Sequence, residues 1–399
     1  MLNREKVIKA IKDKSLLMKS MQDQAFKSLE IFTKQLKEIS EHFTPESFNE
    51  KVLASKEKFA GALATQEFAK GLIHHSIDRP INSAEEANQW KSDVLSDRIV
   101  VAVDGSQIEP DKNLNLFLGA VQVGWFVNFH NGEIPPIKEL DFDLIVPSSN
   151  ALLEEQEFRQ EIAFQRFKKE AQKLIEQMNE LSVLSNNLSM SKRPIAFFDG
   201  SLTLSFVQSE SRKRSYLQVV SELIEASERN QIPLIGYIDT SLAFNIIKSI
   251  EQAFQMVSSG RISDSGLLNN ILTNWGMRSA YFQYFDRGFD AVAGEANVMS
   301  KTGFCYLKAA SGKRPVRLEI PTWVYHAGLL DETVDVVIAQ CLVGNGYPYV
   351  IEVADSIAVI QNAERELFYK YLEQNAGLEL NTSKKQKSKN ARRKPTLIV

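Results

Sequence analysis

The sequence contains little cysteine, no long apolar run and no marked excess of either charge. Cys305 and Cys341 are its only cysteines, and its five histidines are scattered. This scarcity argues against a disulfide framework and against a zinc site with CxxC or HxxxH spacing. No run of about eighteen apolar residues marks a membrane span, and the charged start, MLNREKVIKAIKDKS, lacks a signal-peptide core. We therefore expect a soluble cytoplasmic protein.

The remaining composition is that of a globular protein. Hydrophobic residues make up 44% of the 399-residue chain and charged residues 24%, which excludes wholesale disorder. Lys and Arg number 47 against 50 Asp and Glu, so the formal net charge is −3. A nucleic-acid partner would therefore have to be met by a local basic patch. The length predicts two to three units, or one large domain with an extension.

Changes in amino-acid composition divide the chain into three parts. Residues 1–94 are rich in helix formers, and within residues 1 to about 80 apolar side chains recur at helical spacing. We predict two or three helices there, forming an arm or an outer layer. Residues 95–372 form the main domain. Residues 373–399 include seven Lys or Arg and no acid between Lys384 and Lys394, and we expect a disordered basic tail.

The main domain begins with a β-branched run that is typical of a strand buried on both faces, Ile99 to Val103, ending at Asp104. An antiparallel meander follows with strands over about 116–129 and 137–146, the Asn131-Gly132 pair supplying the turn. Helices and parallel strands then alternate: helix 151–181, strand 194–198, helix 216–228 and strand 233–238. Further β structure over 281–320 and a closing helix from Pro348 to about Tyr371 complete the chain. This order predicts an α/β fold, a ribonuclease H-like mixed sheet flanked by helices, with an N-terminal helical extension.

Two aspartates stand at the ends of apolar strands, each followed by Gly-Ser. They are Asp104 in VAVDGSQ and Asp199 in FFDGSLT. Ligands gather beyond the carboxyl ends of strands in open α/β sheets, and two such carboxylates can share Mg²⁺ or Mn²⁺, which favour oxygen ligands. Asp-Gly-Ser is also ordinary turn sequence. The second copy on a second strong strand favours the shared site.

Further acids are candidates to join this pair. Glu170 lies beside the apolar seam of the long helix, and Glu157 is almost as close by spacing, so both remain open. Asp355 has the apolar helical neighbours Ile351, Ala358 and Val359, and a buried acid needs a partner such as a salt bridge or a metal ion. Asp239 also ends a strand, but Asp-Thr-Ser fits a helix N-cap equally well.

Taken together, these motifs resemble the NurA family, prokaryotic nucleases of ribonuclease H-like fold that process DNA ends. The resemblance covers about residues 95–365. It depends on VAVDGSQ, on a long helix with Arg166 and Glu170, on FFDGSLT, and on GYPYVIEVADSIAVI. The last motif normally has a histidine eight residues after its tyrosine. Tyr347 and Pro348 match the family, whereas Asp355 stands in the histidine position, which leaves activity or the preferred metal open.

The resemblance implies a set of roles for individual residues. Asp104, Glu170 and Asp199 would hold divalent metal, Mn²⁺ or Mg²⁺ and two ions per site, with Asp355 completing the set and Tyr347 contacting the scissile phosphate. Two metals about 3.5–4 Å apart can activate water and stabilise a leaving oxygen in phosphodiester hydrolysis. The resemblance also implies a homodimer that resects single- or double-stranded DNA ends as an exonuclease, with some single-strand endonuclease activity, beside a hexameric HerA-type ATPase.

An acidic site that holds DNA needs basic residues along its approach. The candidates are Arg212, Lys213 and Arg214 after the second motif, and Arg278 and Arg287 near the aromatic residues Trp275, Tyr281 and Phe285. A mixture of aromatic and arginine side chains would suit stacking on single strands. Each of the two clusters could equally be an ordinary solvated surface without a role in DNA binding.

Two other functions remain open from the sequence. An actin-like or sugar-kinase-like ATPase also places Asp-Gly loops after strands, although the second half of the chain has no convincing glycine-rich adenosine loop. A NurA-like subunit whose catalytic site has decayed would explain Asp355. Cleavage assays on Asp104→Ala and Asp199→Ala variants distinguish these functions from a nuclease.

Overall fold

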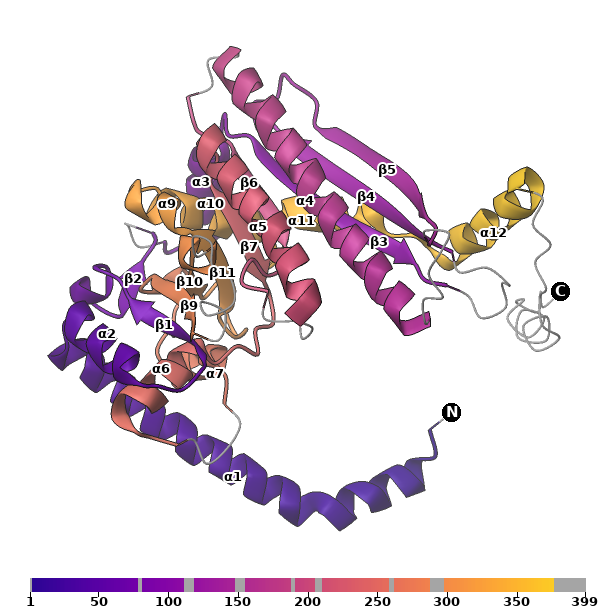
Figure 1. The fold of residues 1–399 in the computed structure, drawn as a ribbon. Helices are drawn as coiled ribbons and strands as arrows, with labels where there is room; N and C mark the ends of the chain where they lie inside the picture. Colours follow the sequence, from indigo (N-terminus) through magenta and orange to yellow (C-terminus); the bar gives the residue numbers. More distant parts are fainter. Residues whose placement is uncertain are drawn as a thin grey trace.

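The computed structural model describes residues 2–77, 81–110, 118–147, 155–187, 191–204, 210–257, 262–287 and 298–376. The predicted tail between Lys384 and Lys394 lies outside the described residues. Within them, one sheet of eleven strands runs through the molecule, with helices on both faces (Figure 1). None of the described helices has the length and apolar character needed to cross a lipid bilayer.

The strands of the main domain follow the predicted order. They are β3 (Val100–Ile108), β4 (Gly119–Asn128), β5 (Ile137–Ile145), β6 (Ile195–Asp199), β7 (Leu234–Ile238), β8 (Met277–Ser279), β9 (Phe282–Asp286), β10 (Thr302–Leu307) and β11 (Val316–Pro321). The sheet order is β1-β9-β10-β11-β7-β6-β3-β4-β5, with β2 and β8 off this path. Strands β3, β4 and β5 form the antiparallel meander, and β3, β6 and β7 pair in parallel. This arrangement confirms the predicted fold class.

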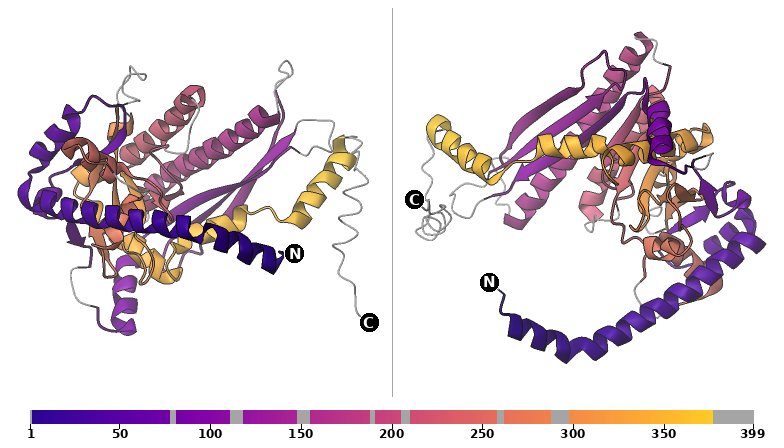
Figure 2. Two further views of the ribbon diagram at one scale, coloured as in Figure 1. Left: turned by 90° about the horizontal axis from the view of Figure 1, so that it is seen from below. Right: turned by 180° about the vertical axis from the view of Figure 1, so that it is seen from behind.

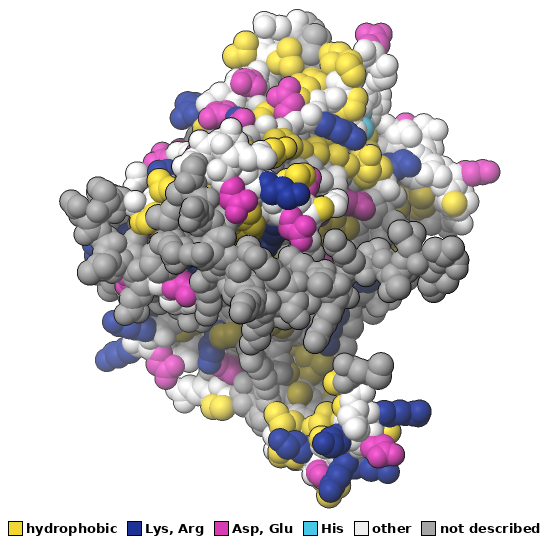
Figure 3. Space-filling view, turned by 90° about the vertical axis from the view of Figure 1, so that its right-hand side faces the viewer, with side chains coloured by type: hydrophobic (Ala, Val, Ile, Leu, Met, Phe, Trp, Pro, Cys, Tyr) yellow, Lys and Arg dark blue, Asp and Glu magenta, His cyan; other side chains and the backbone are white. Residues whose placement is uncertain are grey.

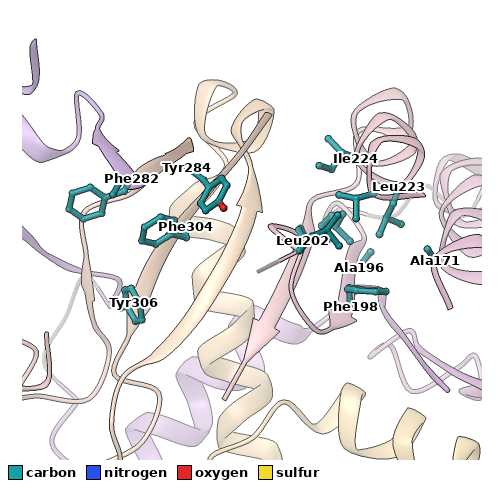
Figure 4. Packing of buried hydrophobic residues seen from close by; sticks show 14 of the residues in the cluster. Ala171, Ala196, Phe198, Leu202, Leu223, Ile224, Phe282, Tyr284, Phe304 and Tyr306 are labelled. Carbon is teal, nitrogen blue, oxygen red and sulfur yellow. The ribbon is translucent and has the colours of Figure 1, made fainter. Parts of the chain in front are cut away.

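The residues of β3 show why the sheet has two cores. Val101 and Val103 belong to one hydrophobic cluster, whereas Val100 and Ala102 belong to the other, because successive side chains of a strand point to opposite faces. The first cluster lies under α4 (Glu155–Asn187) and α5 (Glu210–Asn230), which run side by side across one face (Figures 1 and 2). Figure 4 shows that this cluster extends from Phe282 and Phe304 to Leu223 and Ala171.

The opposite face is covered by helices from several parts of the chain. They are α3 (Ala84–Leu95), α9 (Thr322–His326), α10 (Leu330–Val343) and α11 (Tyr349–Ala358). Helix α11 packs on β3 and β4, where Gly124 leaves room for Ile357 and Ala358. The single closing helix expected from Pro348 to Tyr371 is wrong. Helix α11 ends at Ala358, and a separate helix, α12 (Asn362–Ala376), follows after a short non-helical segment that includes Val359.

The N-terminal region contains the expected helices and also strands. Helix α1 (Arg4–His42) is capped by Asn3, whose side chain accepts a hydrogen bond from the Lys6 amide, and α2 (Pro45–Ala54) follows. The all-helical prediction for residues 1–80 is wrong, because β1 (Ala60–Ala64) pairs with β9 and β2 (Ile73–His75) pairs with β8. A short 3₁₀ turn (Phe68–Lys70) separates these strands. The first half of α1 projects from the body as an arm (Figure 2).

Three short elements complete the described chain. Helices α6 (Asn245–Phe254) and α7 (Asp264–Asn269) follow β7, and a 3₁₀ turn (Val298–Lys301) precedes β10. Helix α6 packs on β1 and α2, so it joins the N-terminal region to the sheet. On the other side of the molecule, Leu140, Phe142 and Leu144 of the edge strand β5 are exposed. Figure 3 shows a face on which hydrophobic side chains are interspersed with charged ones of both signs.

Candidate active site

The two Asp-Gly-Ser aspartates lie side by side at the centre of the sheet. Strands β3 and β6 pair in parallel up to Val103 and Phe198, so the next residues, Asp104 and Asp199, leave the ladder together. Asp199 ends β6 as expected. Asp104 does not end its strand, because β3 continues to Ile108 through pairing with β4 alone. The parallel register, rather than the end of two strands, places the carboxylates together.

The glycines of the two motifs serve different purposes. A side chain on Gly105 would meet Glu170 Oε1 at 2.5 Å and Arg166 Cγ at 3.0 Å, so this glycine lets α4 approach β3. Gly200 has a φ of +150°, and a side chain there would make only ordinary van der Waals contact with the Phe198 ring at 3.5 Å, so it is the backbone conformation that favours glycine. At Gly105 a glutamate side chain therefore occupies the space that the missing side chain leaves.

Helix α4 supplies a buried glutamate to the pair of aspartates. Glu170 is 6% exposed, whereas Glu157 is exposed near the start of the helix, so the structure selects Glu170 from the two candidates. Arg166 Nη1 donates to the Gly105 carbonyl at 3.0 Å, and Arg166 Nε lies 3.6 Å from Glu170 Oε1. Glu170 Oε1 nevertheless has no hydrogen-bond partner among the described residues. A buried carboxylate oxygen is thus left without a donor.

Helix α11 and the loop before it supply two more side chains. The Tyr347 hydroxyl donates to Asp199 Oδ1 at 3.1 Å, and its ring packs edge-on against Tyr237 at 5.2 Å between centroids. Asp355 lies close enough to Asp104 to raise the pKa of the Asp104 carboxyl. The expectation that Asp355 is buried is wrong, because the residue is exposed on α11. Ser106 Oγ donates to the Ala358 carbonyl at 2.5 Å and so fastens the end of α11 to β3.

The crowding of acids raises their pKa values. Burial raises the pKa of Glu170 to about 8, with smaller contributions from Asp104 and Asp199, although Arg166 opposes the shift. Burial likewise raises the pKa of Asp104 to about 7, and Asp199 and Asp355 add to the effect. The pKa of Asp199 is also raised, chiefly by burial, although part of its side chain is exposed to solvent. Carboxyls that resist ionisation beside one another need a cation to hold them charged.

The donor chemistry of this cluster fits hard divalent cations. All four acids and the tyrosine offer oxygen, which Mg²⁺ and Mn²⁺ prefer, and Glu170 Oε1 is an unused acceptor. As they stand, no three or more Asp, Glu, His or Cys side chains in the described part of the chain form a closed ligand set. The carboxylates would therefore have to turn inward when an ion binds. The assignment of the ligands stays a prediction.

A buried glutamate on β11 holds the loop that follows Asp199. Glu319 is 1% exposed, and its Oε2 accepts hydrogen bonds from Leu202 N at 2.7 Å, Thr203 N at 3.0 Å and Ser201 Oγ at 3.0 Å. Its Oε1 accepts from Arg317 Nε at 2.7 Å. Sequence reasoning missed this residue. The available signal was two charges, Arg317 and Glu319, within the otherwise apolar and entirely buried strand VRLEIP.

The predicted DNA-binding residues differ in how far they are buried. Arg278 is unavailable to DNA, because it is 1% exposed and forms ion pairs with Glu67 at 2.6 Å and Asp331 at 2.5 Å. Its expected aromatic neighbour Tyr281 is fully buried, with its hydroxyl bonded to the Ile320 carbonyl. Aromatic and arginine side chains meet here in the core.

The remaining basic candidates lie nearer the surface. Arg287 Nη2 donates to the Leu53 carbonyl at 2.6 Å. On α5, Arg212 contacts Glu161 at 3.3 Å, Arg214 is exposed, and Lys213 lines a cavity together with Asp199. A role of these residues in DNA binding stays a prediction.

The predicted strand-end acid Asp239 also lies beside the site. It follows β7 in the sheet, and its charge contributes to the raised pKa of Asp199. The N-cap interpretation is wrong, because α6 begins at Asn245, after Phe244. Asp239 therefore adds to the negative charge next to Asp199.

Solved structures of similar chains include several nucleases. The NurA nuclease from Sulfolobus solfataricus is 14% identical, with a TM-score of 0.49, over 94% of this chain and 98% of that chain. Endonuclease V from Bacillus subtilis is 14% identical, with a TM-score of 0.32, over 75% and 99%. The catalytic domain of human endonuclease V is 13% identical, with a TM-score of 0.32, over 75% and 92%.

Sequence comparison gives the family. Among curated proteins, none matches the chain. The NurA domain family matches residues 98–360, which span the meander, α4, both Asp-Gly-Ser motifs and α11. This match confirms the resemblance seen in the motifs. Because it covers more than half of the 399 residues, the chain belongs to the NurA family.

Proposed function

We propose that the protein is a divalent-metal-dependent DNA nuclease that processes DNA ends. The observation that supports this function most directly is the meeting of Asp104, Glu170 and Asp199 in one cluster with an unused buried acceptor. Membership of the NurA family supports the same reaction. It also removes the reason to consider an actin-like or sugar-kinase-like ATPase, which was an alternative only because of the Asp-Gly loops.

In this proposal Asp104, Glu170, Asp199 and Asp355 hold Mn²⁺ or Mg²⁺, two ions per site. Bound divalent ions supply charge for the phosphate and a nucleophilic water at neutral pH. Arg166 bonds the Gly105 carbonyl and Gly105 leaves room for Glu170 against β3, while Glu319 holds the loop that follows Asp199. The Tyr347 hydroxyl donates to Asp199 and so orients that carboxylate. In the proposal the same hydroxyl also contacts the scissile phosphate.

The test uses end-labelled single- and double-stranded DNA with Mn²⁺, Mg²⁺ or EDTA. We expect metal-dependent degradation by the wild-type protein and none by Asp199→Ala. Asp141→Asn is the matched control, because Asp141 is an exposed acid on the edge strand β5, where it pairs with Lys173 rather than with any of the clustered carboxylates. Degradation would show that Asp355 works in the family's histidine position. No degradation under any metal would instead support a decayed subunit that binds DNA.

We further propose that the protein is a homodimer and works with a HerA-type hexameric ATPase in double-strand break repair. Family membership supports this assembly. Light scattering measures the mass of the purified protein against the 45.1 kDa of one chain. Stimulation of DNA degradation by the ATPase and ATP tests the partnership. A monomer whose activity the ATPase leaves unchanged would contradict this part of the proposal alone.

A further inference from the structure

One buried side chain outside the carboxylate cluster holds both ends of the turn that carries Tyr347. Gln340 of α10 is fully buried, and its main-chain carbonyl accepts a hydrogen bond from Gly344 N at 2.9 Å. Its side-chain Oε1 accepts a second hydrogen bond from Val350 N, in the first turn of α11, at 3.0 Å. Tyr347 stands midway between these two donors in the sequence. The two bonds therefore bracket the residue whose hydroxyl reaches Asp199.

The start of α11 depends on the bond from Val350. The N–H groups in the first turn of a helix have no acceptor within that helix, and Pro348 at the N-cap has no polar side chain to supply one. Val350 is fully buried, so water does not replace the missing acceptor. A buried N–H without a partner is costly. Gln340 is thus the acceptor that allows α11 to begin at this point.

His130 determines which way the Gln340 amide faces. His130 Nδ1 lies 2.8 Å from the Arg98 carbonyl, which can only accept, so Nδ1 donates and carries the proton. Burial lowers the pKa of His130, so the ring is neutral near pH 7 and Nε2 is an acceptor. Nε2 lies 3.3 Å from Gln340 Nε2 and 3.2 Å from Asn128 Nδ2. The amide nitrogen of Gln340 therefore faces the ring, which leaves its oxygen toward Val350.

The other end of this series of hydrogen bonds is the carboxylate cluster. The Tyr347 hydroxyl donates to Asp199 Oδ1 at 3.1 Å, and burial raises the pKa of Tyr347, so the hydroxyl keeps its proton. Asp355 lies further along α11. A shift in the first turn of this helix would move both side chains relative to β3 and β6.

We propose that Gln340 is a positioning residue, which holds the Tyr347 hydroxyl on Asp199. His130 acts one step earlier, because it orients the Gln340 amide. The inference rests on the proposed nuclease function and adds two residues that serve its site without contacting DNA or metal.

The experiment measures whether Gln340 acts through Tyr347. Gln340→Met keeps the length of the side chain and removes both of its polar groups. On end-labelled DNA with Mn²⁺, we expect Gln340→Met to slow cleavage about two- to tenfold, as loss of the Tyr347 hydrogen bond would. Adding Tyr347→Phe to Gln340→Met should then slow cleavage less than about twofold further, because the hydroxyl has already left Asp199.

A second buried glutamine provides the matched control. Gln177 of α4 is 7% exposed, and its Nε2 donates to Glu180 at 3.1 Å. In a Gln177→Met background, Tyr347→Phe should keep its full effect on the rate. Urea unfolding of each variant confirms that the protein is folded under the conditions of the assay.

Each outcome decides the proposal. If Tyr347→Phe slows wild type and Gln340→Met by the same factor, Gln340 has only a structural role, and the proposal is overturned. An unchanged rate for Gln340→Met overturns it as well. If Gln340→Met does not fold, His130→Phe takes its place, because it removes the acceptor that orients Gln340, and the same reduced effect of Tyr347→Phe is expected.

A separate measurement applies if the wild-type protein cleaves no DNA in any metal. The nuclease function then fails by itself, and the positioning is judged by hydrogen exchange of the amides of residues 344–350 in EDTA. Gln340→Met and His130→Phe should each speed this exchange about tenfold, since the turn opens more readily without its hydrogen bonds. Gln177→Met should leave it unchanged. Exchange as slow in His130→Phe as in wild type would overturn the proposal.

Discussion

Two groups of acids in the main domain differ in what surrounds them. Glu319 and its partner Arg317 are both 1% exposed, and the carboxylate accepts hydrogen bonds from an arginine, two backbone amides and two hydroxyls. Glu170 is almost as deeply buried, yet one of its oxygens has no donor and its other neighbours include acids. The first group stabilises the fold, whereas the second keeps unused capacity for a ligand.

The comparison predicts its largest effect for Asp199→Asn. If Asp199 holds metal as proposed, loss of its charge should reduce DNA cleavage at least about 1,000-fold, which corresponds to about 4 kcal/mol. The free energy of unfolding without metal should stay the same or rise, because one of several repelling carboxylates is removed. Rate measurements with Mn²⁺ and urea unfolding in EDTA test the two halves. A large loss of stability would place Asp199 with the structural acids.

The paired group should respond in the opposite way. Glu319→Gln leaves the Arg317 guanidinium buried without its counter-charge, and breaking such a pair costs about 3 kcal/mol in the free energy of unfolding. Urea denaturation measures this loss. Thr333→Ser serves as the control, because it keeps a hydroxyl at another buried site. An unchanged free energy of unfolding for Glu319→Gln would show that Glu319 does not stabilise the fold, and the two groups of acids would then not differ in this respect.

A smaller effect is expected from the pH dependence of stability in EDTA. Glu170 has a folded pKa raised to about 8 above an ordinary value of 4.5, so the folded state binds more protons between these values. Stability should therefore fall as pH rises through about 8. Glu170→Gln should remove this fall and raise the melting temperature at pH 9 by about 2–4 °C, equivalent to about 1 kcal/mol. Scanning calorimetry at pH 6 and pH 9 tests the sign, and a parallel fall in both proteins would contradict it.

The smallest effect should come from Tyr347→Phe. The ring keeps its packing on Tyr237, and only the hydroxyl that donates to Asp199 is lost. One such hydrogen bond contributes about 0.5–1.5 kcal/mol, so cleavage should slow about two- to tenfold with little change in unfolding. Steady-state kinetics on oligonucleotides measures this. A loss as large as that of Asp199→Asn would show that the hydroxyl acts in the reaction itself.

The sequence predicted the parts of the site that depend on local pattern. Apolar strands followed by an aspartate located Asp104 and Asp199, and helical spacing beside an apolar seam located Glu170. Helical spacing failed for Asp355, because α11 is only ten residues long and its neighbour Val359 already lies outside the helix. Apolar neighbours in sequence therefore did not mean burial.

Contacts between distant segments were beyond this kind of reasoning. Strand β1 has the sequence AGALA, and alanine and glycine are poor strand formers, so its pairing depends on β9 rather than on its own residues. The role of Glu319 depends on a loop more than a hundred residues earlier in the chain. Arg278 was mistaken for a surface residue because its partners, Glu67 and Asp331, are equally remote.

The place of β1 in the sheet sets an order of events during synthesis. Ala64 emerges from the ribosome long before its partner Phe282, and at about 5–20 residues per second the wait is about 10–40 seconds. During that time β1 has no partner strand. Pairing between such distant segments is also slow to form. The earliest strand to be made is thus among the last to be paired.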